Sequence, residues 1–521
     1  MTLITNNLTF DLIAILATLL VCVIAYLKWH LTYWNRLGVP SLNPALFFGD
    51  ATDYLFGKCG VGEQFAKFYG KFKSKGYKHG GVFLGPKCYY VPVDPDLVKH
   101  IMQKDFQHFM NHGFYINEEV DPLTGNLFSL EDAKWRNMRV KLTPTFTSGK
   151  MKMMFQTLAD CTRGLKEIMD NLALNHAPAD IKEILGRFTT DIIGSVAFGI
   201  ECNSLKNPDA EFRKYGRKIV ESGFIDRIKV FLVLSIPHAL LRFWRFKFTN
   251  TEVETFFMGA IQDTVNYREK NNVYRKDFMH LLLQLKNRGL VADDQKITDD
   301  KGNIKENDLI TINELAAQAF VFFLGGFETS STTMSWALYE LATNQDIQEK
   351  LRKEISDVLS RHNNKLSYDA MMEMTYMDKV INETLRKYPP LPIIPRVCNK
   401  DYTIPNTSTK LSRGTSVAIP VLAIHTDPEY YPNPEKFNPE HFNEENIKSR
   451  PGFTWLPFGD GPRICIGMRF GMMQSKVGLA TILKNYKIKL NNKTEFPIKV
   501  DPKNFITTAK GGVWLDVEKL D

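Results

Sequence analysis

Two long apolar stretches stand out from a chain that otherwise alternates short apolar and polar segments. The first runs from Leu8 to Trp29, with Asp11 near one end and Trp34 just beyond the other. As a helix rising about 1.5 Å per residue it would measure roughly 33 Å, close to a hydrocarbon core of about 30 Å. Tryptophans at its end are typical of a membrane interface. We therefore predict that residues 1–30 form a transmembrane anchor.

A cleaved signal peptide fits this first stretch poorly. Such a peptide needs basic residues before the apolar run and small residues at a cleavage site after it. Here Asp11 precedes the uncharged run from Leu12 to Leu27, and the bulky segment 28–36 follows it. A buried core helix is the other alternative. The basic residues after the run place the rest of the chain on the cytosolic side of the membrane.

The second stretch, Ile312 to Leu341, is apolar on nearly every face in its first half, which predicts a buried central helix. Gly325 and Gly326 each cost such a helix about 1 kcal/mol relative to alanine, and room for a ligand would offset that cost. The Thr329 hydroxyl can bond the carbonyl of Gly325 or a ligand. Glu328 is costly here unless it is paired or functional. A glycine-kinked core helix without a function is the alternative.

The remaining pattern predicts a mainly α fold with small β-sheets. Residues 151–285 read as several helices, and Gly80 to Val93 reads as a hairpin. Residues 224–248 mix aromatic with basic side chains and contain Pro237, so they are too broken to span a bilayer. Two interpretations remain for this segment: a surface that rests on the membrane, or an ordinary part of the core. No linker divides residues 31–521, which we expect to form a single domain.

Composition and charge exclude few functions, but they indicate which kinds of partner the protein can bind. Hydrophobic residues make up 44% and charged residues 24% of the 521 positions, as in ordinary globular proteins. The net charge of +8 suits an anionic membrane surface or an acidic partner, and no Lys/Arg cluster predicts nucleic-acid binding. Seven cysteines without disulfide or metal-ligand spacing indicate a reducing compartment.

One of these cysteines, Cys465, lies in a Gly/Pro-rich turn that leads into an apolar helical pattern. A thiolate at a helix start with Arg463 and Arg469 nearby is electrostatically favoured. Backbone amides aimed at such a sulfur would tune a bound metal. A small buried hydrophobe is the alternative for an isolated cysteine.

Two further pairs have helical spacing. Trp135 and Arg139 are four residues apart, and Glu383 and Arg386 are three apart, so the members of each pair share a helix face. Taken alone, the first is compatible with a surface arginine beside a packed tryptophan. The second is compatible with a surface ion pair of at most about 1 kcal/mol.

The whole pattern from Phe458 to Gly467, Phe-Gly-x-Gly-x-Arg-x-Cys-x-Gly, resembles the haem-thiolate loop of cytochromes P450. The pairs Trp135/Arg139 and Glu383/Arg386 and the segment Gly325–Thr329 occur in the order of that family. Residues 142–151 and 458–470 resemble insect microsomal cytochromes P450 of family 6. The resemblance implies a mostly helical triangular prism with small sheets and an N-terminal transmembrane helix.

The resemblance also implies roles for individual residues. Cys465 would bind the iron of haem b, with Phe458, Gly325 and Gly326 also contacting the haem. Thr329 and Glu328 would be the catalytic alcohol and the proton-relaying acid. Glu383 and Arg386 would join a buried network in which this chain has His441 where most of the family has arginine. Trp135, Arg139 and Arg396 would bind the haem propionates, and Arg463 would be a further cofactor-binding residue.

The implied activity is insertion of one oxygen atom from O2 into lipophilic small molecules such as plant toxins and insecticides. Electrons would come from NADPH through NADPH–cytochrome P450 reductase, docked on Lys134, Arg136, Lys141 and Arg469, and cytochrome b5 is a candidate second partner. The location would be the endoplasmic reticulum membrane. Alternatives are a peroxide-rearranging isomerase of the same fold and a haem protein without turnover. The residues expected to line the substrate pocket are Phe114, Tyr115, Phe323, Phe327, Ile393 and Val513.

Overall fold

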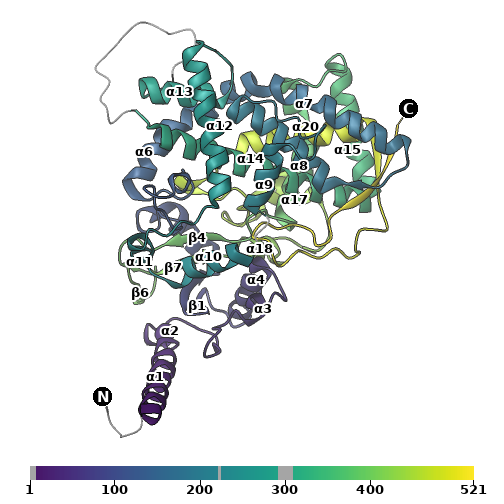
Figure 1. Ribbon diagram of the computed structural model, residues 1–521. Helices are drawn as coiled ribbons and strands as arrows, with labels where there is room; N and C mark the ends of the chain where they lie inside the picture. The colour runs from purple at the N-terminus through teal and green to yellow at the C-terminus, as the bar shows by residue number, and fades with distance from the viewer. Residues whose placement is uncertain (1–7, 221–223, 292–308, 521) are drawn as a thin grey trace.

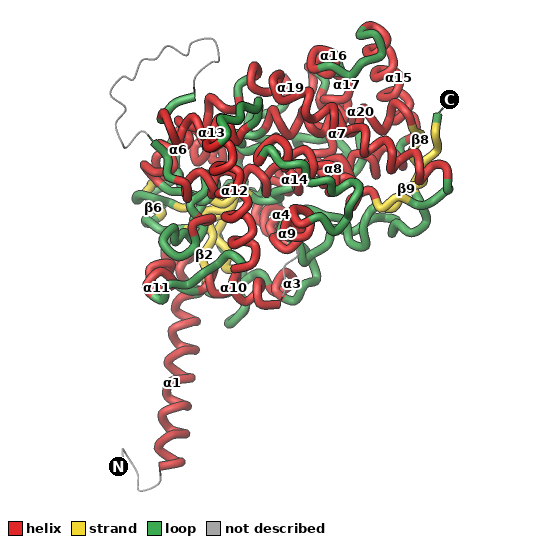
Figure 2. Tube along the Cα trace, turned by 45° about the horizontal axis from the view of Figure 1, so that its top comes forward, coloured by secondary structure: helices red, strands yellow, loops and turns green. Residues whose placement is uncertain are grey.

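The computed structural model describes residues 8–220, 224–291 and 309–520, and its first helix stands apart from the body. Helix α1 (Leu8–His30) projects from the body as a single rod (Figures 1 and 2). In the described part of the chain, Thr9–His30 is the one helix long and apolar enough to cross a membrane, with a mean hydropathy of 2.6. The predicted helix over residues 8–29 is therefore confirmed.

A four-stranded sheet lies next to this helix. Its strands β1 (His79–Leu84), β2 (Lys87–Pro92), β4 (Ile394–Val397) and β7 (Ser416–Ile419) follow the order β1-β2-β7-β4. Strands β1 and β2 form the antiparallel hairpin predicted over residues 80–93. Strand β7 runs parallel to β2 and antiparallel to β4. The sheet therefore joins β4, which contains Arg396, to the N-terminal hairpin of β1 and β2.

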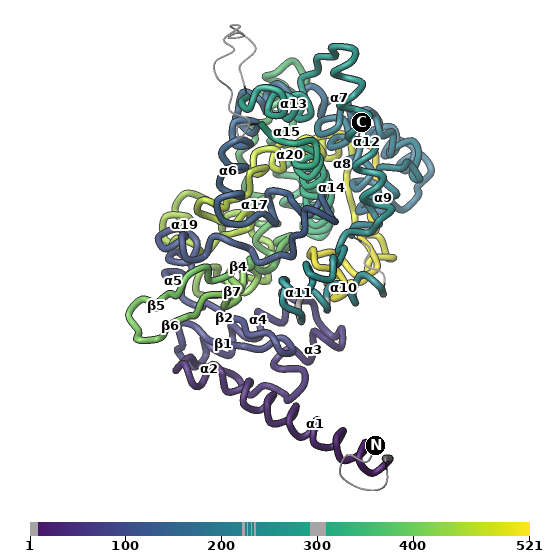
Figure 3. Tube along the Cα trace, turned by 60° about the vertical axis from the view of Figure 1, so that its left-hand side comes forward, coloured from purple at the N-terminus to yellow at the C-terminus, as the bar shows by residue number. Residues whose placement is uncertain are grey.

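Helix α14 (Ile312–Thr343) runs through the middle of the larger, helical lobe (Figure 3). A capping box fixes its start: the Thr311 hydroxyl accepts from the amide of Glu314, whose carboxylate accepts from the amide of Thr311. The helix packs against α8 (Ile181–Ile193), α20 (Met468–Asn485) and α17 (Thr375–Lys387). The predicted central, buried helix is confirmed.

The remaining elements complete the helical lobe and two small sheets. One sheet has the strand order β3-β9-β8, and β5 pairs with β6. The helices and strands not yet named are α2 (Tyr33–Arg36), α3 (Thr52–Leu55), α4 (Val61–Lys73), α5 (Pro95–Lys99), η1 (His100–Lys104), η2 (Phe106–His108), η3 (Pro122–Thr124), α6 (Asp132–Leu142), η4 (Thr143–Phe146), α7 (Ser148–Leu174), β3 (Ala179–Asp180), η5 (Gly194–Phe198), α9 (Glu211–Val220), α10 (Phe224–Ser235), α11 (His238–Phe243), α12 (Thr251–Lys270), α13 (Phe278–Arg288), α15 (Gln345–Arg361), α16 (Tyr368–Glu373), β5 (Tyr402–Thr403), β6 (Lys410–Leu411), α18 (Val421–His425), η7 (Pro439–Phe442), α19 (Glu444–Ser449), η8 (Gly461–Arg463), β8 (Tyr486–Leu490) and β9 (Trp514–Lys519).

Helices α3, α10 and α11 lie on the side of the body from which α1 departs (Figures 1 and 3). Several large apolar side chains on this side are exposed, including Phe243 at 81%, Phe56 at 62% and Trp244 at 59%. Leu241, in contrast, is buried in the body. The region 224–248 is therefore a surface segment held by a few core contacts, and its exposed aromatic side chains favour the membrane-resting interpretation.

A buried ion-pair network ties α17 to the chain that precedes the Cys465 loop. Arg386 donates to both carboxylate oxygens of Glu383, at 2.7 and 2.8 Å, and to the carbonyl oxygen of Pro434 at 2.7 Å. His441 Nδ1 lies 3.2 Å from each Glu383 oxygen, and its Nε2 lies 3.0 Å from the carbonyl oxygen of Pro432. His441 thus takes part in the network, and the surface-pair alternative for Glu383 and Arg386 is excluded.

We predict that Glu383→Ala is strongly destabilising, because it leaves Arg386 buried without a counter-ion. The expected loss is about 3–5 kcal/mol of unfolding free energy, measured by urea denaturation followed through tryptophan fluorescence. Glu373→Ala is the matched control, since Glu373 pairs with Arg361 on the exposed surface, and it should cost at most about 1 kcal/mol. Equal losses in the two variants would contradict the assigned role of the network.

The same network predicts an acid-sensitive contribution to stability. Burial raises the pKa of Glu383, but the bonds from Arg386 and His441 outweigh it and hold the pKa below its ordinary value of 4.5. The contribution is therefore complete above about pH 4.5 and is lost as the pH falls through the lowered pKa of the folded state. A Glu383→Gln variant should lose less stability between pH 5 and 3 than the natural chain does.

Candidate functional site

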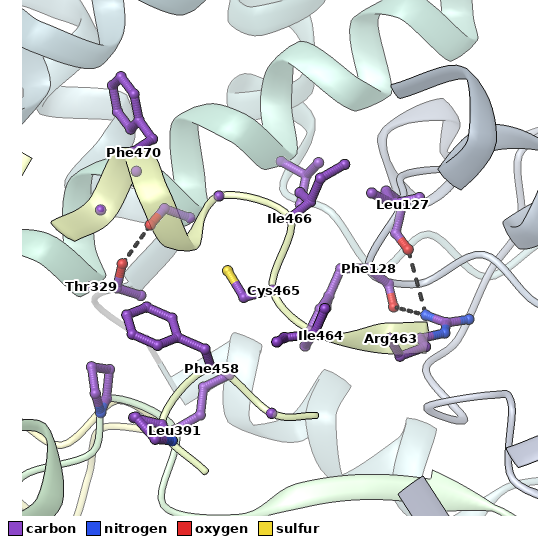
Figure 4. A pocket seen from close by; sticks show the side chains of 18 of the residues that line it. Leu127, Phe128, Thr329, Leu391, Phe458, Arg463, Ile464, Cys465, Ile466 and Phe470 are labelled. Carbon is purple, nitrogen blue, oxygen red and sulfur yellow. Dashed lines mark hydrogen bonds between the residues drawn. The ribbon is translucent and has the colours of Figure 1, made fainter. Parts of the chain in front are cut away.

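The Cys465 loop is shaped by close backbone packing. It follows the short helix η8, and the amide of Cys465 donates to the carbonyl oxygen of Phe458 at 2.8 Å. Gly461 has a φ of 68°, and a Cβ there would lie 1.9 Å from the carbonyl oxygen of Met102. Only glycine fits that position without moving the backbone. This packing turns the Cys465 side chain inward, as Figure 4 shows.

The sulfur of Cys465 faces an internal cavity of about 310 Å³. Its side chain lies deep in the body but is open to the cavity, because protein atoms do not cover it on that side. Burial raises the pKa of the thiol, while the amide of Gly467 and the charge of Arg139 act in the opposite direction. The site therefore supplies the two groups that favour a thiolate where one is needed as a metal ligand.

Helix α14 forms the cavity wall that includes the two glycines. A Cβ on Gly325 would meet nothing within 4 Å, so this glycine leaves free space on the cavity side. A Cβ on Gly326 would come within 2.7 Å of Ile193, so the second glycine lets α14 approach α8. The Thr329 hydroxyl donates to the carbonyl oxygen of Gly325 at 2.6 Å, as expected from the sequence, and Thr329 also lines the cavity.

Glu328 does not line the cavity but pairs with a lysine on α8. Its Oε1 atom lies 2.8 Å from Nζ of Lys182, which also donates to the hydroxyls of Ser331 and Thr332 at 2.8 Å each. Burial lowers the pKa of Lys182, and the charge of Glu328 opposes that shift. The cost of burying Glu328 is thus offset by an ion pair. The sequence alone gave no indication of its partner, which lies 146 positions earlier in the chain.

Two buried arginines lie at one end of the cavity. Arg396 is 1% exposed, its Nε has no hydrogen-bond partner, and burial lowers its pKa to about 10. Burial and the charge of Arg396 lower the pKa of Arg463 to about 9, although Arg463 donates to the carbonyl oxygen of Phe128 at 3.1 Å. In the described residues no carboxylate forms an ion pair with either. Two desolvated cations side by side call for an anionic group.

Trp135 and Arg139 share one face of α6, as predicted, and both line the cavity. Arg139 donates to the carbonyl oxygen of Ile464 at 2.9 Å, which fixes the residue before Cys465. The Arg463 guanidinium stacks over the Trp135 ring at 4.5 Å. The pair thereby supports both the cysteine loop and the cationic end of the cavity.

Of the six residues expected to contact substrate, Ile393 lines the cavity and the other five do not. Phe323 and Phe327 are fully buried and pack against each other with ring centroids 5.0 Å apart. Tyr115 donates to the carbonyl oxygen of Phe246. The role of these six residues toward a substrate stays a prediction. The lining that sequence reasoning missed is mostly apolar but includes one histidine, and it contains His112, Phe128, Val321, Leu391, Ile394 and Ile466.

Phe114 and Val513 lie elsewhere in the body. Phe114 packs against Phe128 with ring centroids 5.0 Å apart, so it lies behind a lining residue. The carbonyl oxygen of Val513 accepts from the amide of Ile181, which joins the C-terminal segment to the start of α8.

The cavity fits a flat apolar group that carries anionic side groups and binds a sulfur ligand. The wall residues Gly325 and Phe458 leave apolar space beside the sulfur of Cys465, and Arg396 and Arg463 offer uncompensated positive charge at one end. Haem, the group implied by the sequence, has these properties.

Comparison with known proteins gives a consistent result over almost the whole chain. The family model described as Cytochrome P450 matches residues 40–515. Cytochrome P450 6A1 of Musca domestica is 45% identical over 499 residues, covering 95% of each chain. Probable cytochrome P450 6a20 of Drosophila melanogaster is 43% identical over 517 residues, covering 97% of this chain and 100% of that one. Cytochrome P450 6a2 of the same fly is 42% identical over 495 residues, covering 94% and 96%.

The Lys182–Glu328 pair predicts a pronounced non-additivity. Lys182→Met leaves a buried carboxylate without a cation and should cost about 3–5 kcal/mol of unfolding free energy, whereas Lys182→Met combined with Glu328→Leu should recover most of it. Thermal denaturation measures both. Lys166→Met, which breaks the more exposed pair with Asp170, is the control and should cost at most about 1 kcal/mol. Additive losses in the double variant would rule out a coupled pair.

Proposed function

From the premise that this chain belongs to the cytochrome P450 family, we propose that it is a microsomal monooxygenase that inserts one oxygen atom from O2 into lipophilic small molecules. Family membership makes the chain a haem monooxygenase. The haem type, the electron source, the substrates and the residue roles are the proposal. The observation that carries it is the Cys465 sulfur open to an apolar cavity that ends at Arg396 and Arg463.

The residues that would hold haem b come from three parts of the chain. Cys465 would bind the iron, and Arg396 and Arg463, with Trp135 and Arg139 beside them, would hold the propionates. When bound, the haem supplies the oxygen-activating iron, to which the thiolate donates electron density. Unpaired buried cations support the propionate assignment, because the anions would remove the cost of burying Arg396 and Arg463.

Thr329 and Glu328 are adjacent in sequence but face different sides of α14. We assign Thr329 to the cavity side, where its hydroxyl can hold a proton next to the reacting oxygen. Glu328 faces α8, where Lys182, Ser331 and Thr332 form a polar cluster. Together they would move protons from the α8 side of the helix to the cavity.

The composition of the cavity wall supports lipophilic substrates. Apolar side chains such as Val321, Leu391 and Ile394 line it, and such a wall binds lipophilic molecules. Plant toxins and insecticides are the proposed classes within lipophilic xenobiotics. Ile393 is the candidate substrate contact that lies on this wall.

We assign residues 1–30 to a membrane anchor and residues 31–521 to one catalytic domain on the cytosolic face of the endoplasmic reticulum. The apolar helix α1 supports the anchor. Exposed aromatic residues on α11 and near α3, on the side from which α1 departs, support a body that rests on the membrane.

Helix α6 gives a reason to place the reductase on the basic face. Its inward side carries Trp135 and Arg139, and its outward side carries the exposed Lys134 and Arg136. Arg469 is exposed at the start of α20, directly after the cysteine loop. An acidic partner docked there would approach the ligand side of the haem. NADPH–cytochrome P450 reductase is the proposed partner, and cytochrome b5 could use the same face.

The oxygen-insertion step is tested by replacing the Thr329 hydroxyl. In membranes reconstituted with reductase and a lipophilic substrate, Thr329→Val should keep consuming NADPH. It should form at least about ten times less product per NADPH consumed, because a positioned proton donor accelerates a reaction on the order of 10²–10⁴-fold. Thr343→Val, at the far end of the same helix, is the control. Unchanged coupling in Thr329→Val, or turnover of hydroperoxides without NADPH, would contradict the proposal.

The docking face is tested by charge reversal. Lys134→Glu with Arg136→Glu should raise the reductase concentration for half-maximal turnover about tenfold and flatten its dependence on ionic strength, since surface charges act through screened attraction. Lys499→Glu with Lys503→Glu, which reverses two lysines on the C-terminal segment, controls for net charge. If the first variant behaved like this control, the basic face would not be the docking site.

A further inference from the structure

His112 lies at the cationic end of the cavity, although no sequence motif identified it. It begins the long loop between η2 and α6, and it lines the cavity together with Arg396 and Arg463. Its ring packs against Phe128, with ring centroids 4.8 Å apart, and against Phe114. The residue therefore sits where the anionic side groups of a bound haem are expected.

The hydrogen bonds of His112 distinguish its two ring nitrogens. Nδ1 lies 2.8 Å from the carbonyl oxygen of Phe128, which can only accept, and this contact is shorter than the one to Arg463, so we assign the hydrogen to Nδ1. Arg463 Nη1 donates to the same oxygen and lies 3.2 Å from Nδ1. In the neutral ring Nε2 then carries a lone pair, and within the described residues it makes no hydrogen bond to protein. A lone pair directed at a carboxylate is repulsive.

The charged groups around His112 come from three segments. Arg396 on β4 and Arg463 in the cysteine loop disfavour a third positive charge, and the acids Glu131 and Asp132 at the start of α6 act on Arg463 from further away. Burial first, and then the charges of the two arginines, lower the pKa of His112 well below its ordinary value. Two carboxylates placed between these groups would reverse the sign of the local field.

We propose that His112 takes up a proton from solvent on Nε2 when a carboxylate side group of the haem binds beside Arg396 and Arg463, and then donates that hydrogen to the carboxylate. The carboxylate stays ionised, Nδ1 keeps its bond to Phe128, and one proton is bound per haem. This inference rests on the proposed haem site. It makes His112 a proton-linked positioning residue for the cofactor.

Linkage fixes the sign of the effect. Because haem binding raises the pKa of His112, the protonated ring stabilises the haem complex below that raised pKa, and the stabilisation is lost as the pH rises through it. Haem retention should therefore weaken as the pH rises from 6 to 8.5. Reduction of the haem adds negative charge and should bind the proton more tightly, so the midpoint potential of the holoenzyme should fall as the pH rises.

The test compares holoenzymes of the natural chain, His112→Gln and His108→Gln. Glutamine keeps a hydrogen-bond donor but cannot titrate. His108 packs against Tyr402 and does not line the cavity, so it is the matched histidine control. Two readouts are needed: the rate of haem transfer to excess apomyoglobin at pH 6 and pH 8.5, and the midpoint potential across the same range by spectroelectrochemical titration.

We expect haem loss from the natural chain and from His108→Gln to accelerate about tenfold between the two pH values for each unit by which the pKa of His112 in the holoenzyme exceeds 6. In His112→Gln the change should be less than about twofold, and its potential should vary less with pH. If His112→Gln lost haem faster than the natural chain by the same factor at both pH values, His112 would bind the haem without taking up a proton. That result would overturn the proposed proton uptake. Identical behaviour of all three proteins would overturn any role of His112.

These failures differ from a failure of the proposed function. If the purified protein holds a thiolate-ligated haem but the variants behave alike, only the inference about His112 falls. A protein without such a haem would remove the premise of both proposals.

Discussion

The positive charge of two buried guanidinium groups has to be balanced by something that the described residues do not supply. Arg396 and Arg463 lie together at one end of the cavity, and carbonyl oxygens satisfy them only in part, since Nε of each has no partner. A fold can keep such groups only if a bound anion compensates them. The anionic side groups of haem would meet this requirement, and Cys465, which lines the same cavity, would bind its iron.

Helix α14 separates two environments that its sequence places side by side. Gly325, Gly326 and Thr329 line the cavity, whereas Glu328 pairs with Lys182 on α8. Gly325 leaves free space in the cavity, and Gly326 also lets α14 approach Ile193 of α8. The charge of Glu328 is thus held away from the cavity, in a buried polar cluster with Lys182.

Local patterns predicted most of the architecture. The N-terminal apolar helix, the hairpin over residues 80–93, the central helix and the bond from Thr329 to Gly325 follow from hydropathy, turn residues and i to i−4 geometry. The family pattern identifies the loop around Cys465. What local patterns could not supply are contacts between distant segments. Lys182 reaches Glu328 across two helices, and His112 reaches Arg463 from a loop without a motif.

Local sequence patterns also fail to predict which residues line the cavity. A helix that is apolar all round gives no periodic signal for the face that lines a cavity. From the sequence we expect Phe323 and Phe327 to line the substrate pocket. Both instead pack into a buried aromatic cluster with Phe198 and Phe257, while Val321 of the same helix lines the cavity. For residues 224–248 the sequence leaves open whether the segment lies on the surface or in the core. One exposed face and a few core contacts produce this mixed pattern of apolar and polar residues. Tertiary packing decides both cases.

The central claim is that the sulfur of Cys465 binds haem iron, and the carbon-monoxide difference spectrum of the dithionite-reduced protein tests it most directly. We predict the strongly red-shifted Soret band that is specific to thiolate-ligated haem, and its loss in Cys465→His while haem remains bound. An imidazole-like band in the natural chain, or a red-shifted band that survives in Cys465→His, would contradict the assignment of the ligand and every role built on it.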